Sequence, residues 1–353
     1  VRQSSIIKKL LENGNLDIHI FGNATFKNTK FNFNNKITYH KIDNIICTKK
    51  NSDGTLSLPK TKKIFDSWSK KKSILVHELK IKIKSFDLVI SDSVPHAIDA
   101  ANELGIYVIN ISHFTWDWFY KKTFKKDSTY RNLVNSYKKT NEFIFPPLTN
   151  YEILNKYKKK ISNINFIITD SFVENKKNLV SQKNIMRCII MDNGSKVLSK
   201  KISKIIKYIE NFQNLYFVIC GSSLKKSQIN FLKKLKYCKV EKNLKKIHAY
   251  ISTCDFLIAR GGYNTITECL ILKKPTLLYS ESKNKEVEGN IDFLKKMNLT
   301  KQISNNFFTK TFKSQIDKFI LNDMKKIKKN FTKYKFGNNG SKQACKIIIS
   351  RVS

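Results

Sequence analysis

The stretch from residue 254 to residue 272 has the residue types and the spacing of an anion site. A short apolar segment ends at the adjacent glycines Gly261 and Gly262, and a helical pattern follows. Glycine lets backbone N–H groups approach a phosphate closely, and the N-terminus of the helix adds a partial positive charge. The stretch predicts a phosphate-binding turn, and the alternative is an ordinary connection between a strand and a helix.

Three side chains of the following helix extend this prediction. Asn264 or Thr265 is expected to cap the helix, because short polar side chains accept hydrogen bonds from its first N–H groups. Glu268 lies about one turn into the helix and is expected to face the bound group. A carboxylate in this place suits the two hydroxyls of a ribose, as in dinucleotide sites. The helix therefore predicts a ribose next to the phosphate.

Two further glycine turns follow predicted strands of the same series. Gly194 comes after a strand over 187–192, and Gly221 comes after a strand over 215–220. Because parallel strands end at one edge of a sheet, these turns and the turn at Gly261 are expected to line a common edge. Three such turns indicate a crevice lined by phosphate-binding backbone groups.

The first half of the chain presents polar side chains at the ends of two other strands. The predicted strands 86–91 and 106–111 flank a helix, and this spacing indicates parallel pairing. Asp92 follows the first strand, and His113 and Asp117 follow the second. Loops at this edge form the ligand crevice of open α/β sheets, so these residues are candidates for an acceptor pocket. For His113 and Asp117 the alternative is a hydrogen-bonded surface turn beside two packed tryptophans.

Length and composition indicate two globular domains. A chain of 353 residues is too long to fold around one compact hydrophobic core, and its 41% of hydrophobic residues is enough to form two such cores. No apolar run approaches the roughly 20 residues that cross a bilayer. The seven cysteines are scattered without a Cys-x-x-Cys pair, so neither a disulfide framework nor a zinc site is expected. We therefore expect a reduced, cytoplasmic protein without a metal or another cofactor.

The formal net charge of +40 comes almost wholly from lysine. Only five of the 67 basic residues are arginines, and the lysines are spread along the entire length. Recognition of nucleic acids depends strongly on the guanidinium group, so the charge disfavours a specific nucleic-acid binder. It does predict attraction to anionic lipid, and hence peripheral contact with the inner face of a membrane.

The order of the predicted elements sets the domain boundaries. We expect a first Rossmann-like domain over 1–170, a linker over 171–186, a second Rossmann-like domain over 187–330, and a C-terminal helix within 331–353 that packs back on the first domain. The chain opens with a helical pattern, whereas a doubly wound domain normally opens with a strand. We therefore expect that the first strand of the first domain and its glycine-rich loop are missing from this sequence.

Two sets of motifs resemble GT-B glycosyltransferases, most closely the group of peptidoglycan N-acetylglucosaminyltransferases and UDP-glucuronosyltransferase-like enzymes. The run Cys254–Glu268 followed by Lys274-Pro275-Thr276 is similar to the donor-domain signature of that group, and Asn193-Gly194-Ser195 is similar to its first glycine-rich loop. The segment from Ser91 to Tyr120 resembles predicted glycosyltransferases and the N-terminal domain of L-arabinokinases. The resemblance implies an α/β protein with two Rossmann-like, doubly wound parallel-sheet domains that face each other across a cleft.

The resemblance also implies donor-binding roles for individual residues. Glu268 would bind the ribose hydroxyls, the segment from Asn243 to Ile247 would contact the base, and Glu286 or Asn290 would contact the hexose. The diphosphate would be held by Gly261, Gly262, Asn264 and Thr265, with Gly194 and Ser195 opposite, and Arg260 and Gly221 complete the donor-binding set.

This chain departs from the resembled group at two places. Relatives often carry paired glutamines where this chain has Glu286-Val287, which leaves the donor hexose open. Relatives also open with a Gly-x-Gly-His loop, whose histidine is a candidate base in part of the family, and this sequence has no such loop. If the chain truly starts at Val1, catalysis is therefore expected to use Asp92, His113 or Asp117, or to be lost.

The expected reaction is the inverting, metal-independent transfer of a hexosyl group from a UDP-linked sugar to an unidentified acceptor hydroxyl, in cell-envelope or polysaccharide biosynthesis. Metal independence is expected because no Asp-x-Asp pair is present to hold a divalent ion on a pyrophosphate. The alternatives are a same-fold epimerase or hydrolase of nucleotide sugars, a non-catalytic nucleotide-sugar binder, and a polyanion-binding protein.

Overall fold

The computed structural model describes residues 2–13, 15–22, 37–42, 46–168, 185–192, 197–221, 224–241, 250–281 and 283–352. The chain divides into two compact units. The first comprises Val1–Lys49, Ser57–Thr169 and Gly337–Ser353, and the second comprises Lys50–Leu56 and Asp170–Phe336. None of the described helices is long and apolar enough to span a membrane. Nearly all of the expected linker over 171–186 lies outside the described residues.

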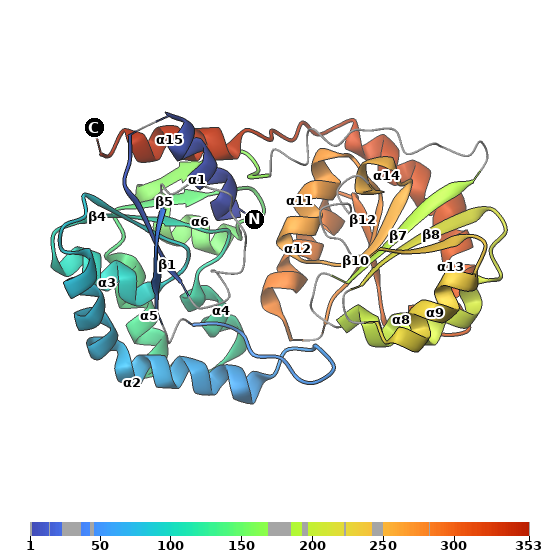
Figure 1. Ribbon diagram of the computed structural model, residues 1–353, viewed down its shortest axis with the longest axis horizontal. Coiled ribbons are helices and arrows are strands. Elements are labelled where there is room, and N and C mark those ends of the chain that lie inside the picture. The colour runs from blue at the N-terminus through green and yellow to red at the C-terminus, as the bar shows by residue number, and fades with distance from the viewer. Residues whose placement is uncertain are drawn as a thin grey trace. The chain divides into compact units, whose positions relative to one another are not determined.

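The described strands of the first unit form two parallel sheets (Figure 1). β1 (Ile18–Gly22) pairs with β2 (Ile37–Lys41). The other sheet has the order β3 (Leu88–Ser91), β4 (Tyr107–Ile111), β5 (Glu142–Phe145) and β6 (Ile161–Asn163). The parallel pairing predicted for the strands near 86–91 and 106–111 is confirmed, with Ser91 opposite Asn110. The loops that follow β3 and β4 therefore share one edge of the sheet.

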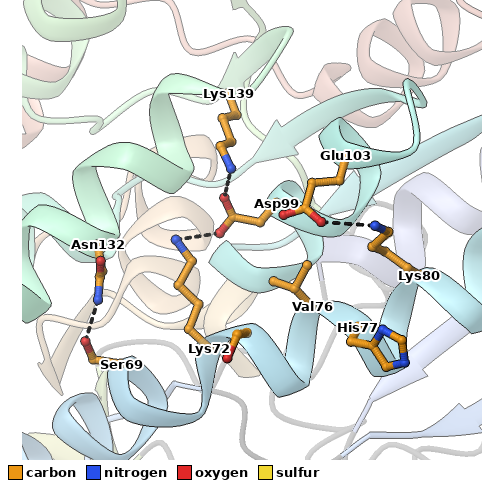
Figure 2. A pocket seen from close by; sticks show the side chains of 10 residues that line it. Ser69, Lys72, Val76, His77, Lys80, Asp99, Glu103, Asn132 and Lys139 are labelled. Carbon is orange, nitrogen blue, oxygen red and sulfur yellow. Dashed lines mark hydrogen bonds and ion pairs between the residues drawn. The ribbon is translucent and has the colours of Figure 1, made fainter.

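Helices lie on both sides of these strands. Figure 1 shows α1 (Arg2–Asn13) beside α15 (Gly340–Ile349) on one side, and α2 (Leu58–Ile83), α3 (Pro95–Glu103) and α5 (Ser128–Lys138) on the other. Ile6 and Leu10 are four residues apart on α1, so they share one face, and they pack with Ile109 of β4 and Ile348 of α15. On the opposite side a polar cavity lies between α2, α3 and α5 (Figure 2).

The last segment of the chain joins the first unit through a close backbone approach. The N–H of Phe166 donates to the carbonyl of Gly337, and the N–H of Gly340 donates to the carbonyl of Phe166, each at 3.1 Å. A Cβ atom on Gly340 would lie 2.0 Å from the carbonyl oxygen of Asn165. Any other residue at this position would force the backbones apart, so Gly340 permits α15 to begin here.

The described strands of the second unit form one parallel sheet of six. Its order is β12 (Thr300–Ile303), β11 (Thr276–Tyr279), β10 (Phe256–Arg260), β7 (Met186–Asp192), β8 (Leu215–Gly221) and β9 (Cys238–Glu241). The chain runs outward from β7 to β9, returns to β10 beside β7, and then runs outward to β12. The strand order therefore reverses between β7 and β10, as in doubly wound sheets.

Further helices among the described residues connect the strands of both units. In the first unit these are α4 (Trp116–Thr123), α6 (Tyr151–Tyr157) and the 3₁₀ turn η2 (Lys158–Lys160). In the second they are α8 (Val197–Ile209), α9 (Lys226–Lys234), α11 (Tyr263–Ile271), α12 (Lys285–Lys296), η3 (Asn305–Phe308), α13 (Phe312–Lys318), the π-helical η4 (Phe319–Asp323) and α14 (Met324–Phe331).

Candidate functional site

The carboxyl ends of four neighbouring strands lie side by side in the second unit. Asp192 at the end of β7 is opposite Gly221 at the end of β8, and Arg260 at the end of β10 is opposite Tyr279 at the end of β11. β7 and β10 are themselves adjacent. The predicted meeting of the ends of β7, β8 and β10 is therefore confirmed, and it coincides with the reversal of strand order, where open α/β sheets bind ligands.

Gly261, the first of the paired glycines after β10, serves a purpose that the sequence does not reveal. Neither has a positive φ, so left-handed backbone does not explain them. A Cβ atom on Gly261 would lie 2.5 Å from Cγ1 and 2.6 Å from Cδ1 of Ile291, and 3.3 Å from Val287. Gly261 is therefore required by the close packing of α12 on the turn, in addition to any approach of a phosphate.

The expected cap of α11 is wrong. The helix begins at Tyr263, and its N-cap is Gly262 with φ −76° and ψ 144°. Asn264 and Thr265 lie inside the first turn, where Asn264 is exposed and Thr265 is buried. A glycine N-cap offers no side-chain oxygen to the first N–H groups, so these donors and the positive end of the helix dipole stay at the carboxyl edge of the sheet.

Glu268 lies on α11 in nearly buried surroundings. Its exposed fraction is 9%, and burial raises the pKa of its carboxyl group to about 8. A carboxyl group with this pKa is largely protonated at neutral pH, and in that form it can both donate and accept a hydrogen bond. In this form the carboxyl group has the chemistry that suits a pair of hydroxyls.

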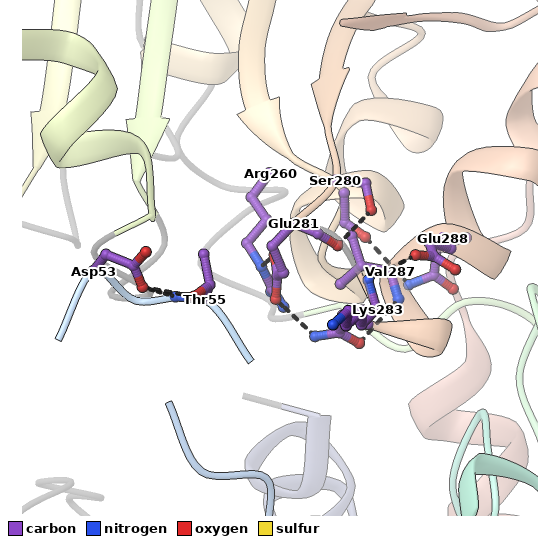
Figure 3. Close-up of polar contacts among 11 residues, drawn as sticks. Asp53, Thr55, Arg260, Ser280, Glu281, Lys283, Val287 and Glu288 are labelled. Carbon is purple, nitrogen blue, oxygen red and sulfur yellow. Dashed lines mark hydrogen bonds and ion pairs between the residues drawn. The ribbon is translucent and has the colours of Figure 1, made fainter. Parts of the chain in front are cut away.

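Arg260 is engaged by a carboxylate that the sequence analysis missed (Figure 3). Its guanidinium group forms a bidentate pair with Glu281, in which Nε donates to Oε2 and Nη2 donates to Oε1 at 2.5 Å. Glu281 is 1% exposed, and Nδ2 of Asn284 donates to its Oε1 at 2.7 Å. The ends of β10 and β11 are thus joined to the N-cap of α12, because Oδ1 of Asn284 accepts from the N–H of Val287.

α12 carries the two residues expected to contact a hexose. Glu286 is partly exposed in the first turn of the helix. Asn290 is 3% exposed, and its Nδ2 donates to the carbonyl oxygen of Gly261 at 3.3 Å. Asn290 therefore holds the glycine turn, and Glu286 is the more accessible of the two.

Two charged residues of this edge were also missed by the sequence analysis. Asp53 belongs to the second unit with residues 50–56, and hydrogen bonds from Thr55 hold the pKa of its carboxyl group below its ordinary value (Figure 3). Lys201 of α8 lies with Nζ 4.6 Å from the ring centroid of Tyr279 and donates to Asn305, and burial lowers its pKa. Glu281 could have been found from the sequence, because it is a carboxylate two residues after the end of a strand. Asp53 does not follow a strand, so the sequence gives no comparable indication for it.

Four expected donor contacts lie outside the described residues: Gly194, Ser195, Asn243 and Ile247. Gly221 ends β8 at the edge described above.

The candidate catalytic residues of the first unit separate into two environments. Asp92 is exposed after β3, and His113 is 5% exposed after β4, so the paired strands bring their loops to one edge. Asp117 is 1% exposed on α4, and its Oδ2 accepts from Lys156 Nζ and, at 3.1 Å, from the hydroxyl of Tyr157. Asp117 thus joins α4 to α6, which indicates a structural role, but as a buried helix residue and not in the surface turn expected as the alternative.

The turn that presents Asp92 is strained and held in place. Ser93 has a φ of 57°, the left-handed region that non-glycine residues rarely occupy. Its hydroxyl donates to the carbonyl of Phe114 at 3.3 Å, and Nε1 of Trp116 donates to the carbonyl of Ser93 at 2.9 Å. Such strain persists only where the surroundings fix the backbone, and it is common at functional turns.

Most of the second unit lies in a region that matches a known sequence family. Residues 193–346 match the glycosyltransferase family 28 C-terminal domain. A search of curated proteins finds no significant match to the chain.

Solved structures resemble the chain over nearly its whole length. A Phytolacca americana UGT2 complexed with UDP-2fluoro-glucose and pterostilbene has a TM-score of 0.68 at 8% identity, covering 100% of this chain and 96% of that one. MurG of Acinetobacter baumannii has a TM-score of 0.62 at 13% identity, covering 99% and 95%. A UDP-N-acetylglucosamine 2-epimerase has a TM-score of 0.55 at 11% identity, covering 99% and 92%.

At these identities the structural likeness establishes the fold, while the family match covers most of the second unit and the first part of the segment Gly337–Ser353. The two findings agree with each other and with the motifs at Cys254–Glu268. The chain therefore has the GT-B fold of the glycosyltransferase superfamily that its motifs resemble, and residues 193–346 match the C-terminal domain of glycosyltransferase family 28.

Proposed function

We propose that the protein transfers a hexosyl group from a UDP-linked sugar to an acceptor hydroxyl, with inversion at the anomeric carbon and without a metal ion. The observation that carries this proposal is the turn between β10 and α11, which lies at the reversal of strand order inside the region matched by the family 28 domain. An uncapped helix N-terminus beside a nearly buried carboxyl group suits a diphosphate next to a ribose.

In the proposed donor site each group has a separate task. The N–H groups at the start of α11 stabilise the negative charge that gathers on the leaving diphosphate, with Thr265 beside them. Glu268 receives the ribose hydroxyls, and Glu286 contacts the hexose. Asn290 and the pair of Arg260 with Glu281 keep α12 in place against the turn.

The proton of the acceptor hydroxyl is assigned to the edge after β3 and β4 of the first unit. We propose His113 as the base, because an imidazole transfers protons near neutral pH, and Asp92 as the alternative on the adjacent strand. Asp117 is not proposed as the base, because Lys156 and Tyr157 already occupy its Oδ2.

Release of UDP from UDP-glucose, UDP-N-acetylglucosamine and UDP-glucuronic acid, with and without hydroxyl acceptors, tests the proposal. Calorimetry with UDP should give saturable binding that Glu268→Ala weakens sharply. Activity should survive an excess of chelator. Saturable UDP binding that is unchanged in Glu268→Ala would contradict the placement of the ribose. UDP release from every donor that is the same with and without an acceptor would contradict transfer.

A second candidate is an epimerase, because a UDP-N-acetylglucosamine 2-epimerase shares the fold over the full chain. An epimerase needs no acceptor and returns an altered sugar still linked to the nucleotide. Analysis of the nucleotide sugar after incubation without acceptor therefore separates the two reactions.

The charge of the chain supports a further part of the proposal. We place the reaction in the cytoplasm, and we propose that the lysine-rich surface contacts anionic membranes. Sedimentation with vesicles containing anionic lipid should be salt-sensitive, and neutral vesicles are the control.

A further inference from the structure

The first unit contains a polar cavity that the proposed reaction does not use. Its volume is about 410 Å³, within the range of small-molecule pockets, and it lies between α2, α3 and α5 (Figure 2). Asp99 and Glu103 line it from the last two turns of α3. Since α3 starts near the carboxyl edge of the sheet and runs away from it, the cavity is separate from the edge that holds Asp92 and His113.

The wall of the cavity contains a buried carboxylate that is shared by two lysines. Nζ of Lys72 lies 2.9 Å from Oδ2 of Asp99, and Nζ of Lys139 lies 2.8 Å from Oδ1. Asp99 is 1% exposed and also accepts from the hydroxyl of Ser136 at 2.5 Å. Figure 2 shows the two lysines reaching Asp99 from different helical segments. The carboxylate therefore fixes both ammonium groups at the wall of the cavity.

The charges at this wall do not cancel. Lys80 pairs with Glu103 at 3.1 Å, so that pair is neutral, but Lys72 and Lys139 share the single charge of Asp99. One positive charge is left over. An ammonium group carries three N–H donors, and the contact with Asp99 uses one on each lysine. Both groups are thus able to donate to a further acceptor in the cavity.

The remaining lining suits a small polar molecule. Ser69 and Ser73 provide hydroxyl groups from α2, and Asn132 of α5 donates to the hydroxyl of Ser69 at 2.7 Å. Lysine ammonium groups are common point-charge partners of phosphate. We infer that this cavity binds a phosphate monoester of a small polar molecule, with its phosphate held between Lys72 and Lys139.

Titration calorimetry of the full chain with inorganic phosphate, and then with glucose 6-phosphate, tests the inference. Lys72→Ala and Lys139→Ala should each weaken binding roughly ten- to a hundredfold, the loss expected for one charged hydrogen bond. Lys80→Ala should weaken binding several-fold and leaves the buried Asp99 with both of its lysine partners. This variant therefore tests the inference even if Lys72→Ala and Lys139→Ala fold poorly. Lys71→Ala removes an exposed lysine of the same helix and should leave the affinity unchanged.

The proposed donor turn is a second place where phosphate could bind. Thr265→Val alters that turn and should leave the affinity for glucose 6-phosphate at the cavity unchanged. If Thr265→Val abolishes phosphate binding and the three cavity variants do not, the inference is wrong. It is equally overturned if the wild type shows no saturable binding, or if Lys71→Ala lowers the affinity as much as Lys72→Ala does.

Discussion

Replacing Gly261 by alanine tests whether α12 packs directly on the glycine turn. The added methyl group would lie 2.5 Å and 2.6 Å from two side-chain carbons of Ile291. Carbon atoms are normally about 3.5–4.0 Å apart, so the turn or the helix must move by about 1 Å. Ile291 has an exposed fraction of 0%, so its side chain cannot move aside into solvent. We expect a loss of about 1–3 kcal/mol in the free energy of unfolding of the second unit.

The control and the rescue come from the same contact. Gly262 has backbone angles that any L-residue adopts, so Gly262→Ala should cost no more than the roughly 1 kcal/mol by which alanine is a poorer N-cap than glycine. Ile291→Ala removes both atoms that clash with the new methyl group. The double variant Gly261→Ala/Ile291→Ala should therefore be less destabilised than the sum of the single variants, by about 1–3 kcal/mol.

Urea unfolding with two probes separates the two units. All three tryptophans (Trp68, Trp116 and Trp118) belong to the first unit, so their fluorescence reports that unit alone, while far-UV circular dichroism reports both. Gly261→Ala should shift the transition that tryptophan fluorescence does not detect and leave the tryptophan transition in place. An unshifted second transition, or strictly additive effects in the double variant, would refute the reasoning about α12.

Three further predictions concern buried charges. Glu281→Gln breaks a buried pair and should cost roughly 3–5 kcal/mol of unfolding free energy in urea titrations, whereas the apolar double variant Arg260→Met/Glu281→Leu should recover most of it. Burial raises the pKa of Glu268 from 4.5 to about 8, so between these pH values the folded chain holds a proton that the unfolded chain has released. The free energy of unfolding should therefore fall as the pH rises through this range. Glu268→Gln should remove that pH dependence. Asp117→Asn should lower the melting temperature of the first unit by disturbing the contact with Lys156, and a full loss of activity at an unchanged melting temperature would instead point to catalysis.

Much of the fold could be predicted from local patterns. The alternation of apolar strands with helices predicts parallel sheets, because strands joined by helices must run in the same direction. α2 (Leu58–Ile83) buries Phe65, Trp68, Leu75 and Leu79, and this helical spacing of apolar residues can be read from the sequence alone. These features depend on residues that are close in sequence, so periodicity detects them.

The site was predicted less completely than the fold. The glycine turn after β10 was located, but its cap was assigned to side chains that lie inside the helix. Glu281 was not recognised, although it forms the bidentate pair with Arg260, because the partner of a side chain at a strand end depends on which strand lies beside it. That neighbour follows from the strand order of the whole sheet.

The sequence by itself determined the class of fold and located the glycine turn after β10, and it predicted a phosphate beside a ribose at that turn. Each follows from residue type and spacing, which act over a few residues. Only the tertiary structure decided that Gly261 is required by Ile291, that Glu281 holds Arg260, and that two lysines share Asp99 in a cavity. These contacts join elements that are distant in the chain, and their geometry exists only once the sheets and helices have packed.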